Sequence, residues 1–267
     1  MGINLNDVLL FHEKNILIYR QGEVRPYRDT LVIEVPLTVY ANGQELSTLV
    51  CSPQGYKELG VGYLLNEGMI SDPADIQDIH HDSDKGILFV EGKIDTPSNG
   101  NGHKRYFPED NETLNSSFYF AKDACQIRPV KSDFRIPASQ LLQLISLLEE
   151  KSLTFRRTGG VHSAALADNS GLIVRYEDIG RHNAVDKVLG YAFLNGIPLD
   201  DKCLVLSGRV ASEIMFKVAR RGIPLILSRS AAMLLAVELA EKLDICIVGF
   251  TRGEQFNVYC HPERIIF

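Results

Sequence analysis

The sequence lacks the features of a membrane-bound or secreted protein. No apolar run among its 267 residues reaches the roughly 18–20 residues that a membrane-spanning helix needs. The first 20 residues carry Asp7, Glu13 and Lys14 among short apolar pieces, a pattern that differs from a signal peptide. Asn6 stands where a myristoylation signal has Ser or Thr. We therefore expect a cytoplasmic protein without a membrane span.

Paired cysteines are also missing. The chain has five cysteines, an odd number with no close pairs, at positions 51, 125, 203, 246 and 260. Cys203 and Cys246 lie inside the apolar runs CLVLS and ICIVGF, which is typical of buried cysteines in strands. This usage fits a reducing cytoplasm and gives no indication of disulfide bonds.

An excess of positive charge is absent. The chain has 28 basic and 34 acidic residues, a formal net charge of −6. Proteins that bind nucleic acids irrespective of sequence are usually basic, so we expect no nucleic-acid partner. The net charge leaves room for a local basic pocket that binds one anionic ligand.

Common nucleotide and zinc motifs are absent as well. The chain has neither GxGxxG nor the Walker lysine motif, which excludes a standard dinucleotide fold and a P-loop. A zinc deaminase needs His-x-Glu and a later Pro-Cys-x-x-Cys, but Ala164 stands two residues after His162 and no Cys-x-x-Cys occurs. Cys260 and His261 are consecutive in the sequence, and this spacing is a poor one for two ligands of the same zinc ion. We expect no zinc and no other metal ligands.

The pattern of the chain predicts two units within a length that suits one large or two modest domains. A polar, turn-rich stretch at about 95–117 separates them. The first unit, 1–115, is predicted to be strand-rich, with a hairpin turn at Asn42-Gly43. Its clearest segments are strands within 30–53 and 87–94 and a short helix within 56–70.

The second unit, 116–267, alternates between strands and helices. A helix is expected over 137–151, with Leu141, Leu144, Ile145 and Leu148 on one face. The β-α-β-α-β order near the C-terminus predicts a largely parallel sheet covered by helices, and an α/β class for the chain, α+β overall. The expected strands are 161–168, 171–178, 203–207, 224–228 and 245–250, and the helices are 181–196, 209–222 and 231–243.

Polar side chains follow four of these strands. In open α/β sheets, ligands bind beyond the carboxyl ends of the strands. Helix N-termini, serine hydroxyls and arginine side chains match the oxygens of phosphate groups. One Ser-Arg pair after a strand usually caps a helix, but the repeated composition predicts a pocket for a phosphate-bearing ligand such as a nucleotide. The residues are Glu177 to His182, then Ser207, Gly208 and Arg209, then Ser228, Arg229 and Ser230, then Phe250, Thr251, Arg252 and Gly253.

Two histidines near these positions have more than one interpretation. His182 and Asp186 are four residues apart and share a helix face near Asp178, which suits either a functional pair or a capping and packing role for Asp186. His162 follows two glycines that would let the backbone approach a ligand closely.

Several of these segments together resemble one protein family. They include TGGVHSAAL, YEDIGRHNAVDKVLGYA, LSGRVASEIMFKVARRGIPLILSRSA and GFTRGEQFNVYCHPERI, with EVPLTVYANG and LGVGYLLNEGMI in the first half. The sequence resembles the FdhD family, the formate dehydrogenase accessory sulfurtransferases, from about residue 30 to its end. Such long ordered strings are highly specific.

The resemblance implies sulfur transfer. A cysteine desulfurase loads a persulfide onto a cysteine of the protein. The sulfur then passes to the molybdenum or tungsten of the bis-molybdopterin guanine dinucleotide cofactor, before its insertion into the formate dehydrogenase apoenzyme. The resemblance also implies a homodimer and a C-terminal domain with cytidine-deaminase-like α/β/α layers and no zinc chemistry.

The resemblance further suggests a ligand for the predicted phosphate pocket. The cofactor carries two guanine nucleotides, so it, or a GDP-like nucleotide, becomes the expected occupant. The stretch that matches the family's cofactor-binding segment is Phe250, Thr251, Arg252, Gly253, Glu254 and Gln255.

The sequence departs from the family at the sulfur-carrying motif. Where the family has Cys-Gly-x-Cys-Gly, this chain has Cys125, Gln126, Ile127, Arg128 and Pro129. Acceptance of a persulfide requires one thiolate, which nearby positive charge on Arg128 would favour. Cys125 is therefore the predicted catalytic residue, with Lys122 and Lys131 adding a little charge.

Two alternatives stay open at this point. The chain could bind the cofactor as a chaperone without transferring sulfur, because Arg128 replaces the second cysteine. It could also be a nucleotide-binding enzyme with a changed role.

Overall fold

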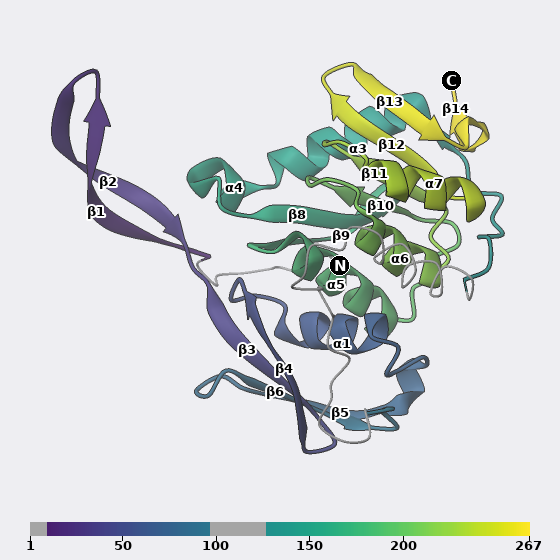
Figure 1. The fold of residues 1–267 in the computed structure, drawn as a ribbon, viewed down its shortest axis with the longest axis horizontal. Coiled ribbons are helices and arrows are strands. Elements are labelled where there is room, and N and C mark those ends of the chain that lie inside the picture. Colours follow the sequence, from purple (N-terminus) through teal and green to yellow (C-terminus); the bar gives the residue numbers. More distant parts are fainter. Residues whose placement is uncertain (1–9, 97–126) are drawn as a thin grey trace, which may run out of the picture.

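The structure is a computed structural model of the chain that describes residues 10–96 and 127–267. At its centre is a six-stranded sheet with the strand order β13-β12-β11-β10-β8-β9 (Figure 1). β10 and β11 are buried along their whole length, because both of their faces are covered. The strands are β8 (His162–Asp168), β9 (Gly171–Asp178), β10 (Cys203–Leu206), β11 (Leu225–Ser228), β12 (Cys246–Arg252) and β13 (Gln255–Cys260).

Helices cover both faces of this sheet. Successive residues of a strand point to opposite sides, so its apolar side chains form a buried face on each side. Leu204 and Leu206 of β10 belong to the buried cluster on one face, and Cys203 and Val205 to the cluster on the other. The predicted mixed α/β class and the three-layer arrangement are confirmed. The first face carries α5 (Arg181–Leu194), α6 (Ser212–Arg220) and α7 (Leu234–Lys242), and the second carries α3 (Ala138–Glu150).

The sheet is less parallel than predicted. Of its strands, β10, β11 and β12 run parallel to one another, whereas β8 pairs antiparallel with β9 and β10, and β13 pairs antiparallel with β12. Short turns at Asn169-Ser170 and Gly253-Glu254 join the two outer hairpins. Such turns connect antiparallel strands only. The three strands of the β-α-β-α-β order are parallel as predicted, and the expected strands 161–168 and 171–178 form a pair, whereas the antiparallel edge strand β13 was not predicted.

A second, four-stranded sheet with the order β4-β3-β6-β5 lies in the first part of the chain. Its β3–β4 hairpin turns at Asn42 and Gly43, whose φ angles of 48° and 75° explain the Asn-Gly sequence. β5 was not predicted, because its sequence IQDIHHD is largely polar. The strands are β3 (Val35–Ala41), β4 (Gln44–Cys51), β5 (Ile76–Asp82) and β6 (Ile87–Gly92).

Helix α1 (Tyr56–Asn66) lies between this sheet and α5, so it connects the two parts of the chain (Figure 1). The two helices approach each other at glycines. A Cβ atom on Gly62 would lie 1.9 Å from the carbonyl oxygen of Asp186, and one on Gly190 would lie 2.0 Å from that of Glu58. Apolar side chains of both sheets belong to one buried cluster, so the two parts share a core.

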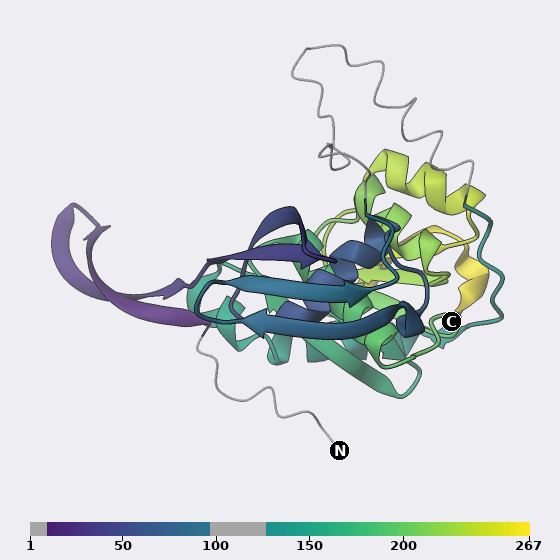
Figure 2. The ribbon, with the colours of Figure 1, turned by 90° about the horizontal axis from the view of Figure 1, so that it is seen from below.

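A two-stranded arm projects from the body of the molecule (Figures 1 and 2). It consists of β1 (Phe11–Arg20) and β2 (Glu23–Val32), joined by a tight turn at Gln21-Gly22. One face of its tip carries the exposed side chains of Leu17 and Tyr19, which are 70% and 73% accessible to solvent. A two-stranded ribbon alone is only marginally stable in water, so contact with another chain would stabilise this arm.

The remaining elements are short. They are α4 (Leu153–Thr158), the strand pair β7 (Ile136–Pro137) and β14 (Ile265–Ile266), and the 3-10 helices η1 (Pro73–Asp75) and η2 (Pro262–Arg264). Within the described ranges, no helix has the length and apolar character that crossing a membrane requires. The boundary predicted between 115 and 116, nearly all of the polar loop predicted at 95–117, and Cys125 lie outside the described residues.

Candidate functional site

The residues predicted to bind phosphate lie along one edge of the six-stranded sheet. The parallel strands β10, β11 and β12 all end at this edge. β8 is antiparallel to β10 and therefore begins there, and β9, which is antiparallel to β8, ends there too. Leu206 of β10 is in register with Ala164 of β8 and with Ser228 of β11. We call this edge the strand-end site; it comprises His162, Arg181, Ser207 to Arg209, Ser228 to Ser230, and Phe250 to Gln255.

Hydrogen bonds hold the segments of the strand-end site side by side. The amide of Arg229 donates to the carbonyl of Leu206 over 3.0 Å, and the amide of Phe250 donates to that of Ser230 over 2.9 Å. The fully buried hydroxyl of Ser228 donates to the carbonyl of Gly208 over 2.7 Å. The hydroxyl of Ser207 accepts a bond from the backbone N–H of Ser163. These two serines therefore shape the loops through backbone contacts.

Three cationic or ionisable side chains converge at one end of this site. His162 is half-buried, and its burial, followed by the charges of Arg181 and Arg209, lowers the pKa of its imidazole. The effect of Asp178 opposes this shift without reversing it. The imidazole is thus held neutral near two guanidinium groups. A Cβ atom on Gly208 would lie 3.3 Å from Nδ1 of His162, so glycine keeps this space open.

Arg181 carries the clearest sign of a missing ligand. Its Nε is shielded from solvent, and no hydrogen-bond acceptor in the described part of the chain reaches it. Buried donors nearly always have a partner, because leaving one unpaired costs about 1–3 kcal/mol. Arg209 is exposed, and its charge acts on the nearby imidazole of His162. Together these guanidinium groups suit the oxygens of an anion such as phosphate.

The hairpin between β12 and β13 forms the other end of the strand-end site. Phe250 is 40% exposed and has a positive φ of 50°, and its ring lies 5.7 Å below the guanidinium carbon of Arg252. Arg252, Gly253, Glu254 and Gln255 are exposed, whereas Thr251 is buried with a hydroxyl that no described residue pairs.

Arg229 is less available than Arg252. Its guanidinium forms an ion pair with Glu149 of α3, and both side chains are about half exposed. Arg252 instead donates from Nε to the carbonyl of Arg229 at 3.4 Å, a long bond that leaves its other nitrogens free to reach a ligand. The exposed hairpin tip thus offers a guanidinium and an aromatic ring side by side.

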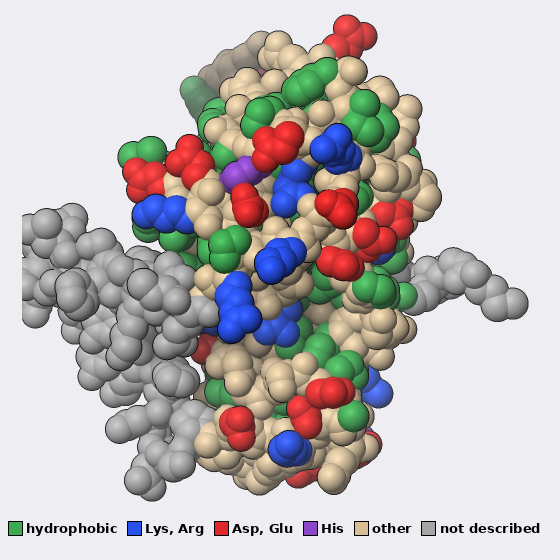
Figure 3. Space-filling model, turned by 90° about the vertical axis from the view of Figure 1, so that its right-hand side faces the viewer, with side chains coloured by type: hydrophobic (Ala, Val, Ile, Leu, Met, Phe, Trp, Pro, Cys, Tyr) green, Lys and Arg blue, Asp and Glu red, His purple; other side chains and the backbone are tan. Residues whose placement is uncertain are grey.

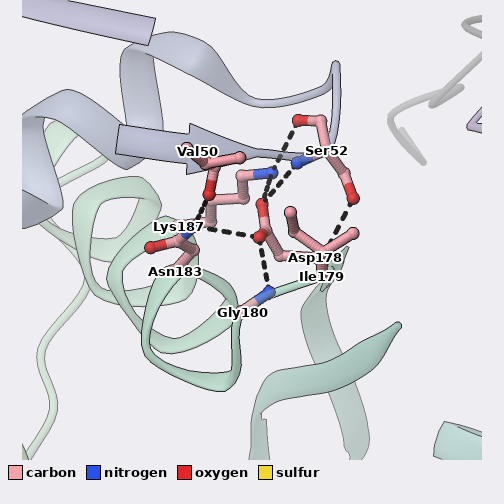
Figure 4. A network of polar contacts seen from close by, with 7 residues as sticks. All are labelled: Val50, Ser52, Asp178, Ile179, Gly180, Asn183 and Lys187. Atoms are coloured by element: carbon pink, nitrogen blue, oxygen red, sulfur yellow. Dashed lines mark hydrogen bonds and ion pairs between the residues drawn. The ribbon is translucent and has the colours of Figure 1, made fainter. Parts of the chain in front are cut away.

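A buried polar network behind the site fixes the loop that carries Arg181 (Figure 4). The Asp178 carboxylate accepts bonds from Lys187 Nζ at 2.5 Å, from the Gly180 amide at 2.9 Å and from Asn183 Nδ2 at 3.0 Å. It also accepts a bond from the Ser52 amide of the first unit at 3.1 Å. Both ionic side chains have no exposure to solvent. The network therefore ties the end of β4 to the start of α5.

His182 and Asp186 have separate partners. Nε2 of His182 lies 2.9 Å from a carboxylate oxygen of Glu213 at the start of α6. Asp186 forms an ion pair with Lys217 and accepts a bond from Asn66 of α1 at 2.6 Å. These contacts favour the packing role for Asp186 over a functional pair with His182. In the part of the chain that the structure describes, no group of three or more His, Cys, Asp or Glu residues could hold a metal ion.

Four of the five cysteines are unsuited to nucleophilic chemistry. Cys51, Cys203, Cys246 and Cys260 are free thiols and all are buried. Burial raises the pKa of Cys51 and of Cys260 to about 11 and that of Cys203 to about 12. Burial also raises the pKa of Cys246. Thiols with such pKa values stay protonated near neutral pH and react slowly.

The fifth cysteine, Cys125, lies two residues before Ile127, where the second described range begins. The residues that follow run along the sheet end opposite to the strand-end site. There the amide of Val130 donates to the carbonyl of Leu243, which precedes β12. Arg128, at the position of the family's second cysteine, is exposed.

The sequence matches the profile of the FdhD/NarQ family over residues 32–266. The chain belongs to the FdhD/NarQ family. The resemblance inferred from the sequence motifs is thereby confirmed.

Curated members of the FdhD/NarQ family are similar over almost their whole length. The "Sulfur carrier protein FdhD" of Bacillus pumilus (strain SAFR-032) is 40% identical over 247 residues, 92% of this chain and 94% of the relative. The protein of the same name from Bacillus subtilis (strain 168) is 38% identical over 252 residues, 94% and 96% of the two chains. The crystal structure of a candidate formate dehydrogenase accessory protein from Desulfotalea psychrophila superposes with a TM-score of 0.82 at 27% identity, covering 97% of this chain and 100% of that one.

Sequence reasoning did not single out Arg181 or the Asp178 network in this family member. Arg181 stood in the list of strand-end residues, but its unpaired buried Nε is visible only in three dimensions. Asp178 and Ser52 are 126 residues apart, and no local pattern connects them. One signal was available: Gly180 stands directly before Arg181, where a Cβ atom would lie 3.1 Å from the side-chain nitrogen of Asn183.

Proposed function

We propose that the chain is a sulfur carrier that serves formate dehydrogenase and holds sulfur as a persulfide on Cys125. One observation carries this proposal: the other four of the five cysteines are buried thiols whose pKa is raised. Cys125 is the remaining thiol in the sequence. The names of the curated relatives, sulfur carrier proteins, support the same role.

In the proposed reaction, the thiolate of Cys125 attacks the outer sulfur of a persulfide on a cysteine desulfurase. A new S–S bond forms on Cys125, and the cysteine of the donor leaves as a thiolate, so no external oxidant is required. Arg128 provides positive charge three residues away. Because Arg128 cannot form a disulfide, release of the sulfur must go to the substrate itself or to an external thiol.

The substrate in this proposal is the bis-molybdopterin guanine dinucleotide cofactor, and the strand-end site would bind its phosphate groups. Arg181, Arg209 and Arg252 supply guanidinium groups for those oxygens, and Phe250 offers a ring that can stack against a base. The buried unpaired Nε of Arg181 fits such a ligand. The bound cofactor brings the metal that receives the sulfur.

We also propose that the chain works in the reducing cytoplasm as a homodimer that delivers the loaded cofactor to the formate dehydrogenase apoenzyme. The exposed apolar tip of the β1–β2 arm, with Leu17 and Tyr19, supports a contact between chains. Light scattering tests this part, and the mass of a single chain at micromolar concentration would contradict it.

The sulfur-carrier role predicts the outcome of complementation. In bacteria whose own family member is deleted, this chain should restore formate dehydrogenase activity, whereas Cys125→Ala should leave it at the level of the deletion strain. Cys203→Ala, a buried thiol whose pKa is about 12, is the matched control and should restore activity. Full restoration by Cys125→Ala would contradict sulfur transfer.

A second function, a cofactor-binding chaperone without sulfur transfer, is favoured by Arg128 at the position of the second cysteine. Both functions require nucleotide binding at the strand-end site. We expect calorimetry to detect GDP binding that Cys125→Ala leaves unchanged and that Arg252→Ala weakens about 10-fold or more, because a charge-assisted hydrogen bond is lost. Arg25→Ala on the exposed arm is the control. Equal affinity of Arg252→Ala and the unaltered chain would exclude this site.

A further inference from the structure

Two adjoining cavities lie at the end of the sheet opposite to the strand-end site. The larger has a volume of about 770 Å³ and the smaller about 290 Å³. They share Leu199, Arg220 and Arg221 in their walls. The larger one is bounded by the segment Ile127–Lys131, by the residues before β10 and by the end of α6. Its volume falls in the range of about 300–1,000 Å³ that is usual for small-molecule sites.

The larger cavity is strongly basic. Arg128, Lys131, Arg220 and Arg221 line it, and among the described lining residues Asp200 is the single carboxylate. Figure 3, which faces this end of the molecule, shows Lys and Arg side chains gathered near its centre. Cations at the end of a helix such as α6 are favoured by its dipole. The C-terminus of a helix carries about half a negative charge, which is too little to balance four cationic side chains.

Arg221 gives the second, independent indication of a ligand. Its Nε is shielded from solvent and meets no hydrogen-bond acceptor among the described residues. Burial, and then the charge of the neighbouring Arg220, lowers the pKa of the Arg221 guanidinium. Arg220 already donates to the carbonyl of Asn66 over 2.8 Å, whereas the shielded Nε of Arg221 is a donor that an anion would satisfy.

The rest of the lining is apolar. Pro129, Val130, Pro198, Leu199 and Ala219 provide surface that an anion alone would not use. A wall of prolines and aliphatic side chains beside the Arg221 guanidinium matches a molecule with a phosphate at one end and an apolar group at the other.

We propose that this cavity binds a small phosphorylated organic molecule at a site separate from the strand-end site. Arg221 binds its phosphate, Arg128 and Lys131 contact the phosphate from the opposite wall, and the apolar lining contacts its organic group. The ligand would connect the segment Ile127–Lys131 with the end of α6. The proposal does not depend on sulfur transfer or on the strand-end site.

Calorimetry on the full chain at low salt, with phenyl phosphate and inorganic phosphate as probes, tests this proposal. We expect one phenyl phosphate per chain at this cavity, bound more tightly than inorganic phosphate. Arg221→Gln and Arg128→Gln should each weaken binding at least about 10-fold, because each removes a charge-assisted contact. Arg252→Gln, at the strand-end site, should leave this binding unchanged.

Three results would overturn the proposal. One is the absence of phenyl phosphate binding up to 10 mM, a concentration at which even weak sites of about 1 mM are occupied. Another is binding that Arg252→Gln removes but that Arg221→Gln and Arg128→Gln retain. Equal affinity for the two probes would exclude an organic ligand. Because Arg128 is exposed, Arg128→Gln stays informative even if Arg221→Gln does not fold.

Discussion

Replacement of Lys187 by methionine is expected to lower the free energy of unfolding by about 3–5 kcal/mol. Lys187 and Asp178 are both fully buried and lie 2.5 Å apart. Without the ammonium group, the carboxylate would stay buried with hydrogen bonds but with no opposite charge. Chemical denaturation followed by circular dichroism measures the change.

Two further variants separate the ion pair from general packing. Lys85→Met breaks an exposed pair with Asp82, 3.3 Å long, and should change stability by no more than about 1 kcal/mol. Adding Asp178→Asn to Lys187→Met should restore part of the lost stability, because the amide removes the uncompensated charge. A double variant less stable than Lys187→Met alone would contradict this account of the network.

Replacement of Gly62 by alanine is expected to cost about 3 kcal/mol of stability. The added Cβ would lie 1.9 Å from the carbonyl oxygen of Asp186, a backbone atom of α5 that cannot rotate away. Helices α1 and α5 would have to separate, and the first unit would lose its close contact with the second. In thermal unfolding we expect the midpoint to fall by about 6–12 °C.

Gly60→Ala in the same helix is the matched control. Its Cβ would meet a side-chain methyl carbon of Leu88 at 2.0 Å. A leucine side chain can change its rotamer, so this variant should cost less than Gly62→Ala. The helix propensity gained on replacing glycine by alanine is the same in both. If the two variants were equally destabilised, the backbone contact would not be the cause.

The sequence predicted those elements whose residues carry a local pattern. Helix α3 has four apolar residues at helical spacing, and all four are buried. The strands β10, β11 and β12 are short apolar runs between helices. The arm formed by β1 and β2 was missed, because its strands mix charged and apolar residues and pack on no core. The pairing of β8 with β9 fits the short turn between the two expected strands, whereas the edge strand β13 was not predicted.

The candidate site was predictable in position but not in detail. The rule that ligands bind beyond strand ends placed the candidate residues at the ends of β10, β11 and β12 along one edge, although Ser228 and the segment 250–252 belong to the strands themselves. Whether a side chain there faces a ligand or the protein depends on long-range contacts. Ser228 bonds to the backbone of Gly208 and Arg229 pairs with Glu149, whereas Arg181 and Thr251 each keep a buried polar atom that no described residue pairs.

The most direct test of the sulfur-carrier role is the mass of the chain after incubation with a cysteine desulfurase and free cysteine. We predict the mass of one added sulfur atom, located on the peptide that contains Cys125, removed by reductant and absent from Cys125→Ala. The account would be contradicted if Cys125 gained no sulfur under conditions that load a family member with both cysteines, or if the sulfur were found on Cys51, Cys203, Cys246 or Cys260 instead.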